Sequence, residues 1–247
     1  MIQAITIDFW NTIVDSRNGA ARRAVRDAAM QDAYRHAGRE WDTAEADDAF
    51  RVSYEYFERH WRDEQRTPSA SESLGVIWEH LGISVEEDMH ARVVRSFEDS
   101  ILAGMPGLLP GAADAIAALG ARYRLALISD TAYSPGRVLR QVLEAHGVAQ
   151  HFDFLAYSDE VGVSKPHPRI FETALAACDA EAAHAVHIGD IERTDIAGAR
   201  AMGMRSILFR GDPSGRYYDE NGEDRTAADA VAHGWQDVLS IISTFDS

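Results

Sequence analysis

Four short stretches of the chain carry the polar residues best suited to chemistry. The β-branched run Ile5-Thr6-Ile7 ends in the carboxylate of Asp8. The other three are a run at 125–128 followed by Ser129-Asp130, a loop containing Ser164-Lys165-Pro166, and a run at 186–188 followed by Gly189-Asp190 and then Asp195. β-Branched residues favour strands, and open α/β sheets present reacting groups at the carboxyl ends of their strands. We therefore expect these side chains to meet at one edge of a sheet.

The residue types indicate chemistry with an anion and a divalent cation. Asp8 and Asp190 would bring two carboxylates together, and such a pair stays ionised most easily around a hard cation such as Mg²⁺. Ser129 offers a hydroxyl beside backbone amides that can surround an anion. Lys165 is the only lysine among 24 basic residues, and its compact charge could balance Asp8 and bind a phosphate oxygen. Taken singly, each residue could equally be a turn former, a helix cap or a surface lysine.

In this order and spacing, the four stretches resemble the four sequence motifs of the haloacid dehalogenase superfamily, and the resemblance covers the whole chain. It implies that Asp8 is a nucleophile whose covalent intermediate is later hydrolysed by water, with Lys165 and Ser129 as further catalytic residues. It implies Mg²⁺ as cofactor and that Asp195 orders Lys165 or a metal-bound water. The metal site would comprise Asp8, the backbone carbonyl of Trp10, Asp190 and Asp195. The substrate would contact Trp10, Asn11, Thr12, Ser129, Asp130 and Lys165.

The sequence departs from the phosphatases of this superfamily at two positions. Those enzymes usually carry a second Asp two residues after the nucleophile, followed by Gly, and here Trp10 and Asn11 occupy these positions. The second Asp protonates the leaving group and activates water, a role typically worth ~10² to 10⁴ in rate. Trp10 cannot take that role, because an indole N–H donates a hydrogen bond without useful acidity.

Three functions remain compatible with this departure. The favoured one is Mg²⁺-dependent hydrolysis of a phosphate ester or acyl phosphate of a small metabolite, either slow or limited to leaving groups that need no proton. A second is dehalogenase-like hydrolysis at carbon, because dehalogenases of the superfamily carry an aromatic residue at the position of Trp10. They typically lack the metal-binding Gly-Asp pair, however, which is intact here as Gly189-Asp190. A third is phosphate binding without turnover.

The hydrophobic pattern predicts the elements that position these residues. From 16 to 105 it predicts four helices, at 19–37, 42–62, 69–81 and 84–101, and no strand. From 106 onward helices and strands alternate, which is typical of a doubly wound parallel sheet. We therefore expect an α/β protein with a Rossmann-like core of residues 1–15 and 106–247. Residues 16–105 would form an inserted all-helical domain, which the resemblance implies is a mobile cap over the active site.

Two groups of residues in the helical segment have open roles. The aromatic residues of the second helix are expected to pack in the bundle core, although a wall facing the ligand is the alternative; they are Tyr54, Tyr56, Phe57 and Trp61. The arginines near the hinge are expected to form a solvated face, although one could reach a substrate anion; they are Arg17, Arg22, Arg23 and Arg26.

Composition limits the partners. The 247 residues are 46% hydrophobic and carry a formal charge of −16, so nucleic acid and anionic membranes would be repelled. No apolar run approaches the ~20 residues of a membrane span, and Met1-Ile2-Gln3 leads directly into the first strand. We expect a cytoplasmic protein that acts on a small anionic metabolite. The composition does not indicate an oligomeric state.

Overall fold

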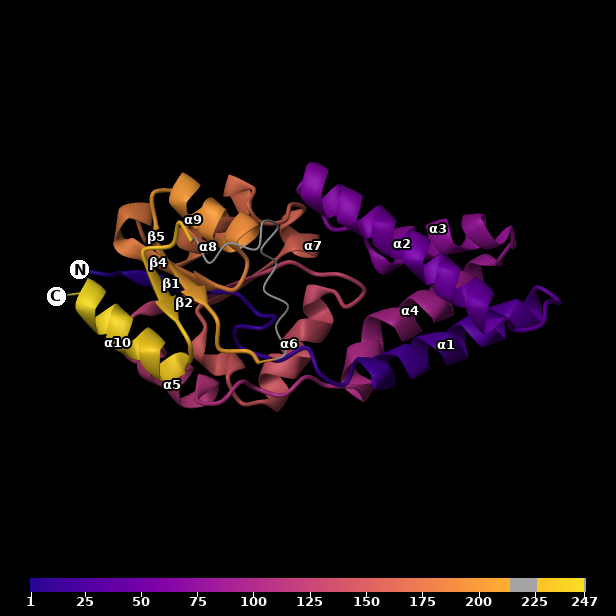
Figure 1. The fold of residues 1–247 in the computed structure, drawn as a ribbon, viewed down its shortest axis with the longest axis horizontal. Coiled ribbons are helices and arrows are strands. Elements are labelled where there is room, and N and C mark those ends of the chain that lie inside the picture. The colour runs from indigo at the N-terminus through magenta and orange to yellow at the C-terminus, as the bar shows by residue number, and fades with distance from the viewer. Residues whose placement is uncertain (214–225, 247) are drawn as a thin grey trace.

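The computed structural model describes residues 1–213 and 226–246, and it contains a layered α/β part and a helical bundle (Figure 1). The exposed loop expected at 211–226 falls largely outside the described residues. None of the described helices is both long enough and apolar enough to cross a membrane.

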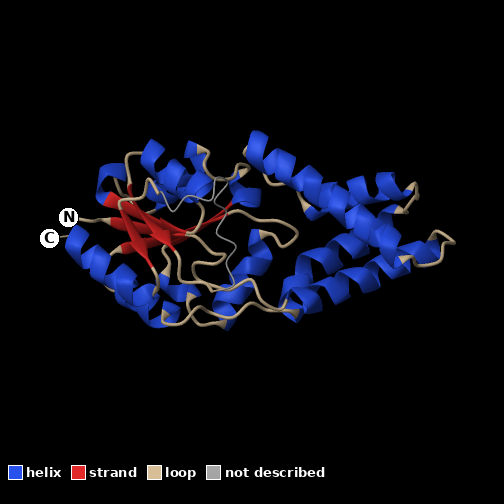
Figure 2. Cartoon of the chain, viewed as in Figure 1, coloured by secondary structure: helices blue, strands red, loops and turns tan. Residues whose placement is uncertain are grey.

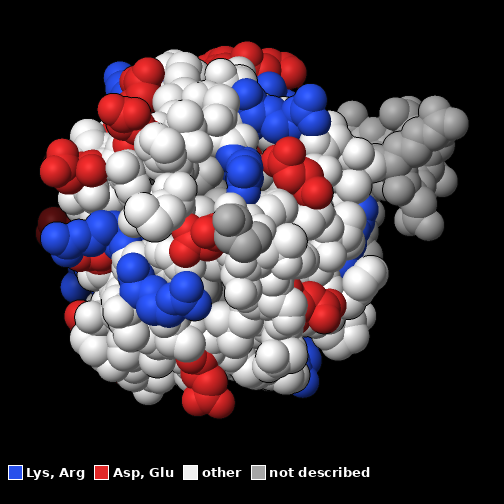
Figure 3. Space-filling model, turned by 90° about the vertical axis from the view of Figure 1, so that its left-hand side faces the viewer, with Lys and Arg blue, Asp and Glu red and all other residues white. Residues whose placement is uncertain are grey.

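The surface at the end of the molecule farthest from the bundle carries both kinds of charge. Basic side chains lie among acidic ones there (Figure 3).

Six parallel strands form one sheet in the order β3-β2-β1-β4-β5-β6. Strand β1 lies in the interior of the sheet, and Ile7 is in register with Leu127 on one side and Ile188 on the other. The chain builds outward from β1 through β2 and β3 and then returns to place β4 on the other flank. This reversal is the point where open α/β sheets bind ligands. The strands are β1 (Ala4–Ile7), β2 (Arg124–Ser129), β3 (Phe154–Tyr157), β4 (Ala185–Gly189), β5 (Arg205–Phe209) and β6 (Ala230–Ala232).

Helices cover both faces of the sheet (Figure 2). Buried residues of α5 (Ala112–Gly120), α6 (Gly136–Ala145) and α10 (Trp235–Phe245) pack with Ile5 and Ile7 on one face. Residues of α8 (Pro168–Ala177) and α9 (Ala197–Ala201) pack with Ala4 and Ile128 on the other. The short helix α7 (Ser158–Val161) follows β3 directly. The expected doubly wound α/β core is confirmed.

The segment between β1 and α5 forms four helices that lie to one side of the sheet (Figure 1). They are α1 (Gly19–His36), α2 (Thr43–Asp63), α3 (Ala70–Leu81) and α4 (Glu87–Ala103). Ser69 and Glu72 form the capping box that starts α3. Helix α4 begins three residues later than expected, because Ile83 and Val85 pack against the bundle core in an extended segment. The division into a core of 1–15 and 106–247 and a cap of 16–105 stays a prediction.

Candidate active site

Asp8 is the first residue after β1, and a tight turn holds it in place. Its backbone N–H donates to the carbonyl of Ile188 at 2.8 Å, so the sheet pairing extends to the residue itself. The chain then reverses, and the amides of Ile13 and Val14 donate to the carbonyl of Phe9 at 3.0 and 3.1 Å. Asn11 lies in this turn with φ 54°, in the left-handed region that Asn tolerates better than most residues. The turn leaves Asp8 only 5% exposed.

Lys165 lies between two carboxylates. Its Nζ forms an ion pair with Oδ1 of Asp8 and a second one, at 2.7 Å, with Oδ1 of Asp195. Burial alone would lower the pKa of Lys165, but the charges of Asp195 and Asp8 outweigh burial and raise it. The only lysine of the chain is therefore held as a cation against the expected nucleophile.

A buried hydrogen-bonded chain lies behind Lys165. Nε2 of His187 lies 2.9 Å from Oδ1 of Asp195, and Nδ1 of His187 lies 2.8 Å from the hydroxyl of Thr6. Burial lowers the pKa of His187, so we assign the neutral ring, with Nε2–H donating to Asp195 and Nδ1 accepting from Thr6. Oδ2 of Asp195 accepts from the amide of Ile191 at 3.0 Å. The sequence analysis assigned no role to His187 or Thr6. A histidine inside an apolar strand could have indicated a buried hydrogen-bonded role for His187.

Asp190, the first residue after β4, lines the same cavity as Asp8. Its Oδ2 accepts a hydrogen bond of 3.1 Å from the side-chain amide of Asn11. Burial raises the pKa of Asp190 well above its usual value, and the charges of Asp8 and Asp195 raise it further. Burial also raises the pKa of Asp8 to about 7, despite the opposing charge of Lys165. Both carboxylates thus lack sufficient positive charge around them.

This donor set fits Mg²⁺. Two buried carboxylates that line one cavity suit a cation that uses few protein ligands and keeps several waters. Among residues 1–213 and 226–246, no three His, Cys, Asp or Glu side chains group so that they could hold a metal ion, so the set has no third side-chain ligand of these types. Both oxygens of Asp195 already accept hydrogen bonds, an arrangement that supports the ordering of Lys165. Direct coordination of a metal by Asp195 stays a prediction.

Asp130 joins three segments of the chain. Its Oδ1 accepts from the amide of Lys165 at 2.9 Å, and its Oδ2 accepts from the indole N–H of Trp61 on α2 at 2.8 Å. Ser129, at the end of β2, is fully buried, and its hydroxyl lies 3.4 Å from the carbonyl of Asp130. Asp130 therefore fixes the Lys165 loop and ties the bundle to the sheet.

A cavity of about 170 Å³ opens above Asp8. Phe57 and Trp61 of α2 form part of its wall, so the expectation that these two residues belong to the bundle core is wrong. Tyr54 is 53% exposed, and Tyr56 packs on His60 at 4.0 Å between ring centroids. Helical periodicity predicted the aromatic stripe but not which neighbour it faces. The expected site residues that line the cavity are Asp8, Trp10, Asn11, Asp130, Lys165, Asp190 and Asp195.

Two expected site residues lie behind this surface. Thr12 and Ser129 are fully buried and are not among the residues that line the cavity. The hydroxyl of Thr12 donates to Oδ2 of Asp8 over 3.5 Å, and its carbonyl accepts from the indole of Trp235 at 3.0 Å. In this structure Thr12 contacts the expected nucleophile itself.

Trp10 forms a side wall of the cavity. Its ring packs edge-on against Phe9 with centroids 5.1 Å apart, and the guanidinium of Arg22 lies 5.3 Å from the ring centre. The position at which the phosphatases of the resembled superfamily usually carry a second Asp is thus filled by an indole that packs between a core residue and an arginine.

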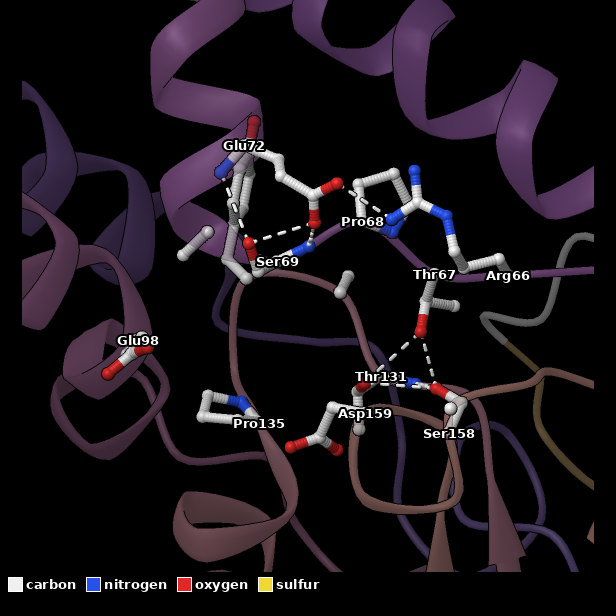
Figure 4. Close-up of a pocket in the computed structure, with 14 residues that line it drawn as sticks. Arg66, Thr67, Pro68, Ser69, Glu72, Glu98, Thr131, Pro135, Ser158 and Asp159 are labelled. Atoms are coloured by element: carbon white, nitrogen blue, oxygen red, sulfur yellow. Dashed lines mark hydrogen bonds and ion pairs between the residues drawn. The ribbon is translucent and has the colours of Figure 1, made fainter.

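A larger cavity, of about 330 Å³, lies at the junction of bundle and sheet (Figure 4). The hydroxyl of Thr67, between α2 and α3, lies 2.6 Å from that of Ser158, which also accepts from the amide of Thr131 at 2.8 Å. The amide of Ser164 donates to the carbonyl of Gln65 at 2.7 Å. These bonds attach the 64–69 segment to the loops that carry Asp130 and Lys165.

Comparison with known proteins agrees with this geometry. A family model for haloacid dehalogenase-like hydrolases matches residues 2–203. The solved 2-haloacid dehalogenase of Pseudomonas syringae pv. Tomato superposes with a TM-score of 0.73, covering 99% of this chain and 100% of that one. Its sequence is 20% identical, so this likeness concerns the fold. The chain belongs to the haloacid dehalogenase-like hydrolase family.

Curated relatives match over shorter stretches. The human haloacid dehalogenase-like hydrolase domain-containing protein 3 is 40% identical over 105 residues, 42% of this chain. The ribulose-1,5-bisphosphate 5-phosphatase of Halopiger xanaduensis is 37% identical over 97 residues, 39% of this chain. Each matched stretch covers 40% of the relative's own length. The chain is thus similar in part to phosphatases of this family.

Proposed function

We propose that this protein is a Mg²⁺-dependent hydrolase of phosphate esters or acyl phosphates of small metabolites, with Asp8 as nucleophile. The observation that carries the proposal is the pair of buried carboxylates, Asp8 and Asp190, whose raised pKa values call for a cation, beside the fixed ammonium of Lys165. The phosphatase names of the partial relatives support the same chemistry. A cytoplasmic location stays an expectation.

Each side chain of the site would have its own role in the reaction. Oδ1 of Asp8 is engaged by Lys165, and Oδ2, which accepts only the long hydrogen bond of 3.5 Å from Thr12, would attack phosphorus. A bond forms between Oδ2 and phosphorus while the bond to the leaving oxygen breaks, and water then attacks phosphorus to release phosphate and restore the Asp8 carboxylate. Asp195, oriented by His187, keeps the ammonium of Lys165 against Asp8 and the transferring group.

The proposed metal would be held by Asp8, Asp190 and the carbonyl of Trp10. When bound, Mg²⁺ neutralises charge on the transferring phosphoryl group, which is the main requirement of this chemistry. Asn11 orients Asp190 through its side-chain amide.

The cavity lacks a side chain well suited to protonate the leaving group. Trp10 is not acidic, and both oxygens of Asp130 already accept hydrogen bonds. We therefore assign substrates whose leaving oxygen departs as an anion, such as acyl and aryl phosphates. The same feature favours a second candidate, hydrolysis at carbon with departure of halide, for which no acid is needed. Asp190 argues against it, because a cation there competes for the nucleophile.

Phosphate release from aryl, acyl and alkyl phosphates, with Mg²⁺ or with EDTA, tests the proposal. We expect Mg²⁺-dependent release from the first two classes and its loss in Asp8→Asn, which conserves shape but removes the nucleophile. Asp99→Asn, which removes a carboxylate paired with Arg137 outside the cavity, is the matched control and should keep full activity. Release that survives EDTA or Asp8→Asn would exclude the proposal, and halide release from 2-haloacids would favour the second candidate.

A further inference from the structure

The four arginines near the hinge divide into two kinds. Arg17 pairs with Asp15, and Arg23 pairs with Asp27 at 2.6 Å and with Asp47. Nε of Arg22 instead donates to the carbonyl of Gly104 at 2.8 Å, and Nε of Arg26 donates to the carbonyl of Arg22 at 3.3 Å. The expected solvated face therefore holds for only part of the group.

Arg22 and Arg26 line a second small cavity of about 170 Å³. No carboxylate is among the described residues that line it, so the two guanidinium groups are its only charged groups. The hydroxyls of Ser100 and Ser134 donate to backbone carbonyls at 2.8 and 2.9 Å. The lining residues are Trp10, Arg22, Arg26, Ser100, Ile101, Ala132, Tyr133 and Ser134.

Both guanidinium groups lie in surroundings that disfavour their charge. Both side chains are only partly exposed, and they lie four residues apart on α1. Burial lowers the pKa of Arg26, whose guanidinium lies 5.0 Å from the ring centre of Tyr133. Among the described residues no carboxylate forms an ion pair with either arginine; partly desolvated cations of this kind are costly, and an anionic ligand would offset that cost.

This cavity adjoins the one above Asp8. Trp10 and Ala132 line both cavities, and Arg22 packs over the Trp10 ring. The cavity above Asp8 and the cavity with the arginine pair therefore meet at Trp10 and Ala132. The planar guanidinium fork suits bidentate binding of either a carboxylate or a phosphate.

Resting on the function proposed above, we infer that Arg26, with Arg22 beside it, binds a second anionic group of the substrate, remote from the phosphoryl group that Asp8 attacks. The substrate class is thereby a small metabolite with two anionic ends, either a phosphorylated carboxylic acid or a bisphosphate.

Hydrolysis-resistant phosphonates test this inference in the wild-type protein without turnover. Calorimetric titration in the presence of Mg²⁺ compares phosphonoacetate, phosphonopropionate and phosphonobutyrate with ethyl-, propyl- and butylphosphonate. Alkylene bisphosphonates of the same lengths distinguish a second phosphate from a carboxylate. For at least one chain length, we expect the phosphonate with a second anionic group to bind about ten- to a hundredfold more tightly than the alkylphosphonate of the same length. This ratio corresponds to the free energy of one hydrogen bond to a charged group.

Substitutions on α1 show whether Arg26 is responsible. In Arg26→Gln the advantage should disappear, and Arg26→Lys, which keeps the charge but not the fork, should recover part of it. Arg23→Gln is the matched control, because it removes a guanidinium of the same helix that already has carboxylate partners. It should keep the full advantage. Thermal melts establish that each variant is folded.

The outcomes separate this inference from the proposed function. Equal affinity within every probe pair, an advantage that survives Arg26→Gln, or binding of none of the phosphonates would overturn the inference. If simple aryl phosphates are nevertheless hydrolysed, the proposed function stands without it. An advantage that depends on Arg26 in a protein that hydrolyses no phosphate would support the anion site and overturn the proposed function.

Discussion

Three buried aspartates of one site have pKa values displaced in opposite directions. Burial would raise the pKa of Asp195, but Lys165 and His187 outweigh burial and lower it, whereas burial raises the pKa of Asp8 and Asp190. Environments that push neighbouring titratable groups apart in this way assign them different roles. Asp195 remains an anion that positions Lys165, and the other two carboxylates are those that a cation would stabilise.

The substitution Trp10→Asp tests the departure from the phosphatase pattern. A carboxylate at this position could in principle supply the ~10² to 10⁴ of general acid and base catalysis. The guanidinium of Arg22, now 5.3 Å from the indole centre, would pair with the new carboxylate and keep it ionised. We therefore expect less than a tenfold gain with alkyl phosphates, measured as kcat/KM, and some loss of thermal stability from the missing ring.

Pairing with Arg22 makes a further outcome checkable. Addition of Arg22→Gln to Trp10→Asp should free the carboxylate and raise alkyl phosphate hydrolysis above that of the single variant, while aryl phosphates gain less. Equal gains on both substrate classes would contradict the proton-transfer explanation, because a phenolate leaves without a proton.

The sequence grouped Asp8, Asp190 and Lys165 because each follows a strand-like run or lies in the loop beyond one, and the structure brings all three to one cavity. It did not reveal that Phe57 and Trp61 face the cavity, because a helical stripe of aromatic residues has the same pattern against a bundle core or a ligand. The partners of Arg22 and Arg26 were equally hidden. Whether a carboxylate stands opposite an arginine depends on segments up to about 80 residues away, such as Gly104, whose carbonyl accepts from Arg22 instead.

At the scale of elements, apolar runs in the sequence predict every strand of the sheet. Hydrophobic periodicity does not predict one short helical segment. Residues Glu192–Ile196 form a π-helical turn, in which the amide of Ile196 donates to the carbonyl of Ile191 at 3.4 Å. A wider turn leaves no mark on hydrophobic periodicity. It positions Asp195 so close to Gly189 that a Cβ on Gly189 would lie 2.3 Å from Cγ of Asp195, so only glycine fits there.

The bundle and the sheet are coupled through Trp61, which gives a prediction for α2. Trp61→Phe removes the N–H that donates to Asp130 and leaves a buried carboxylate oxygen without that donor. We expect a fall in kcat/KM of about tenfold and faster amide hydrogen exchange at the end of α2. Trp78→Phe is the matched control, since it loses an indole hydrogen bond to His90 within the bundle. Equal effects of the two substitutions on kcat/KM would show that Trp61 acts only through bundle stability.

At the scale of the whole molecule, the site should make stability depend on pH and Mg²⁺. Asp8 binds protons more tightly in the folded state, because burial raises the pKa of its carboxyl from 3.8 to about 7. Its contribution to folding stability is therefore full at low pH and is lost as pH rises through this window, and Asp190 acts in the same direction. The lowered pKa of Asp195 acts oppositely, but its contribution is lost only below the usual carboxyl range.

We therefore expect the melting temperature of the EDTA-treated protein to fall between about pH 4 and pH 7, and Mg²⁺ to restore it at pH 7. A shift of several degrees is expected, since ~1 kcal/mol moves Tm by ~2–4 °C in a chain of this size. Asp190→Asn should flatten the pH dependence, raise the metal-free Tm at pH 7 and weaken Mg²⁺ binding in calorimetry. An unchanged Mg²⁺ affinity in this variant would remove Asp190 from the metal site.

The oxygen atoms of Asp8 report most directly on how this molecule reacts. The protein is allowed to turn over an aryl phosphate in ¹⁸O-water and is quenched in acid, and the peptide containing Asp8 is weighed by mass spectrometry. Our account predicts a phosphoryl group on Asp8 during turnover and unlabelled carboxylate oxygens afterwards, because water attacks phosphorus. Turnover with no phosphoryl adduct, or ¹⁸O accumulating in the Asp8 carboxylate as attack on an ester carbon requires, would contradict it.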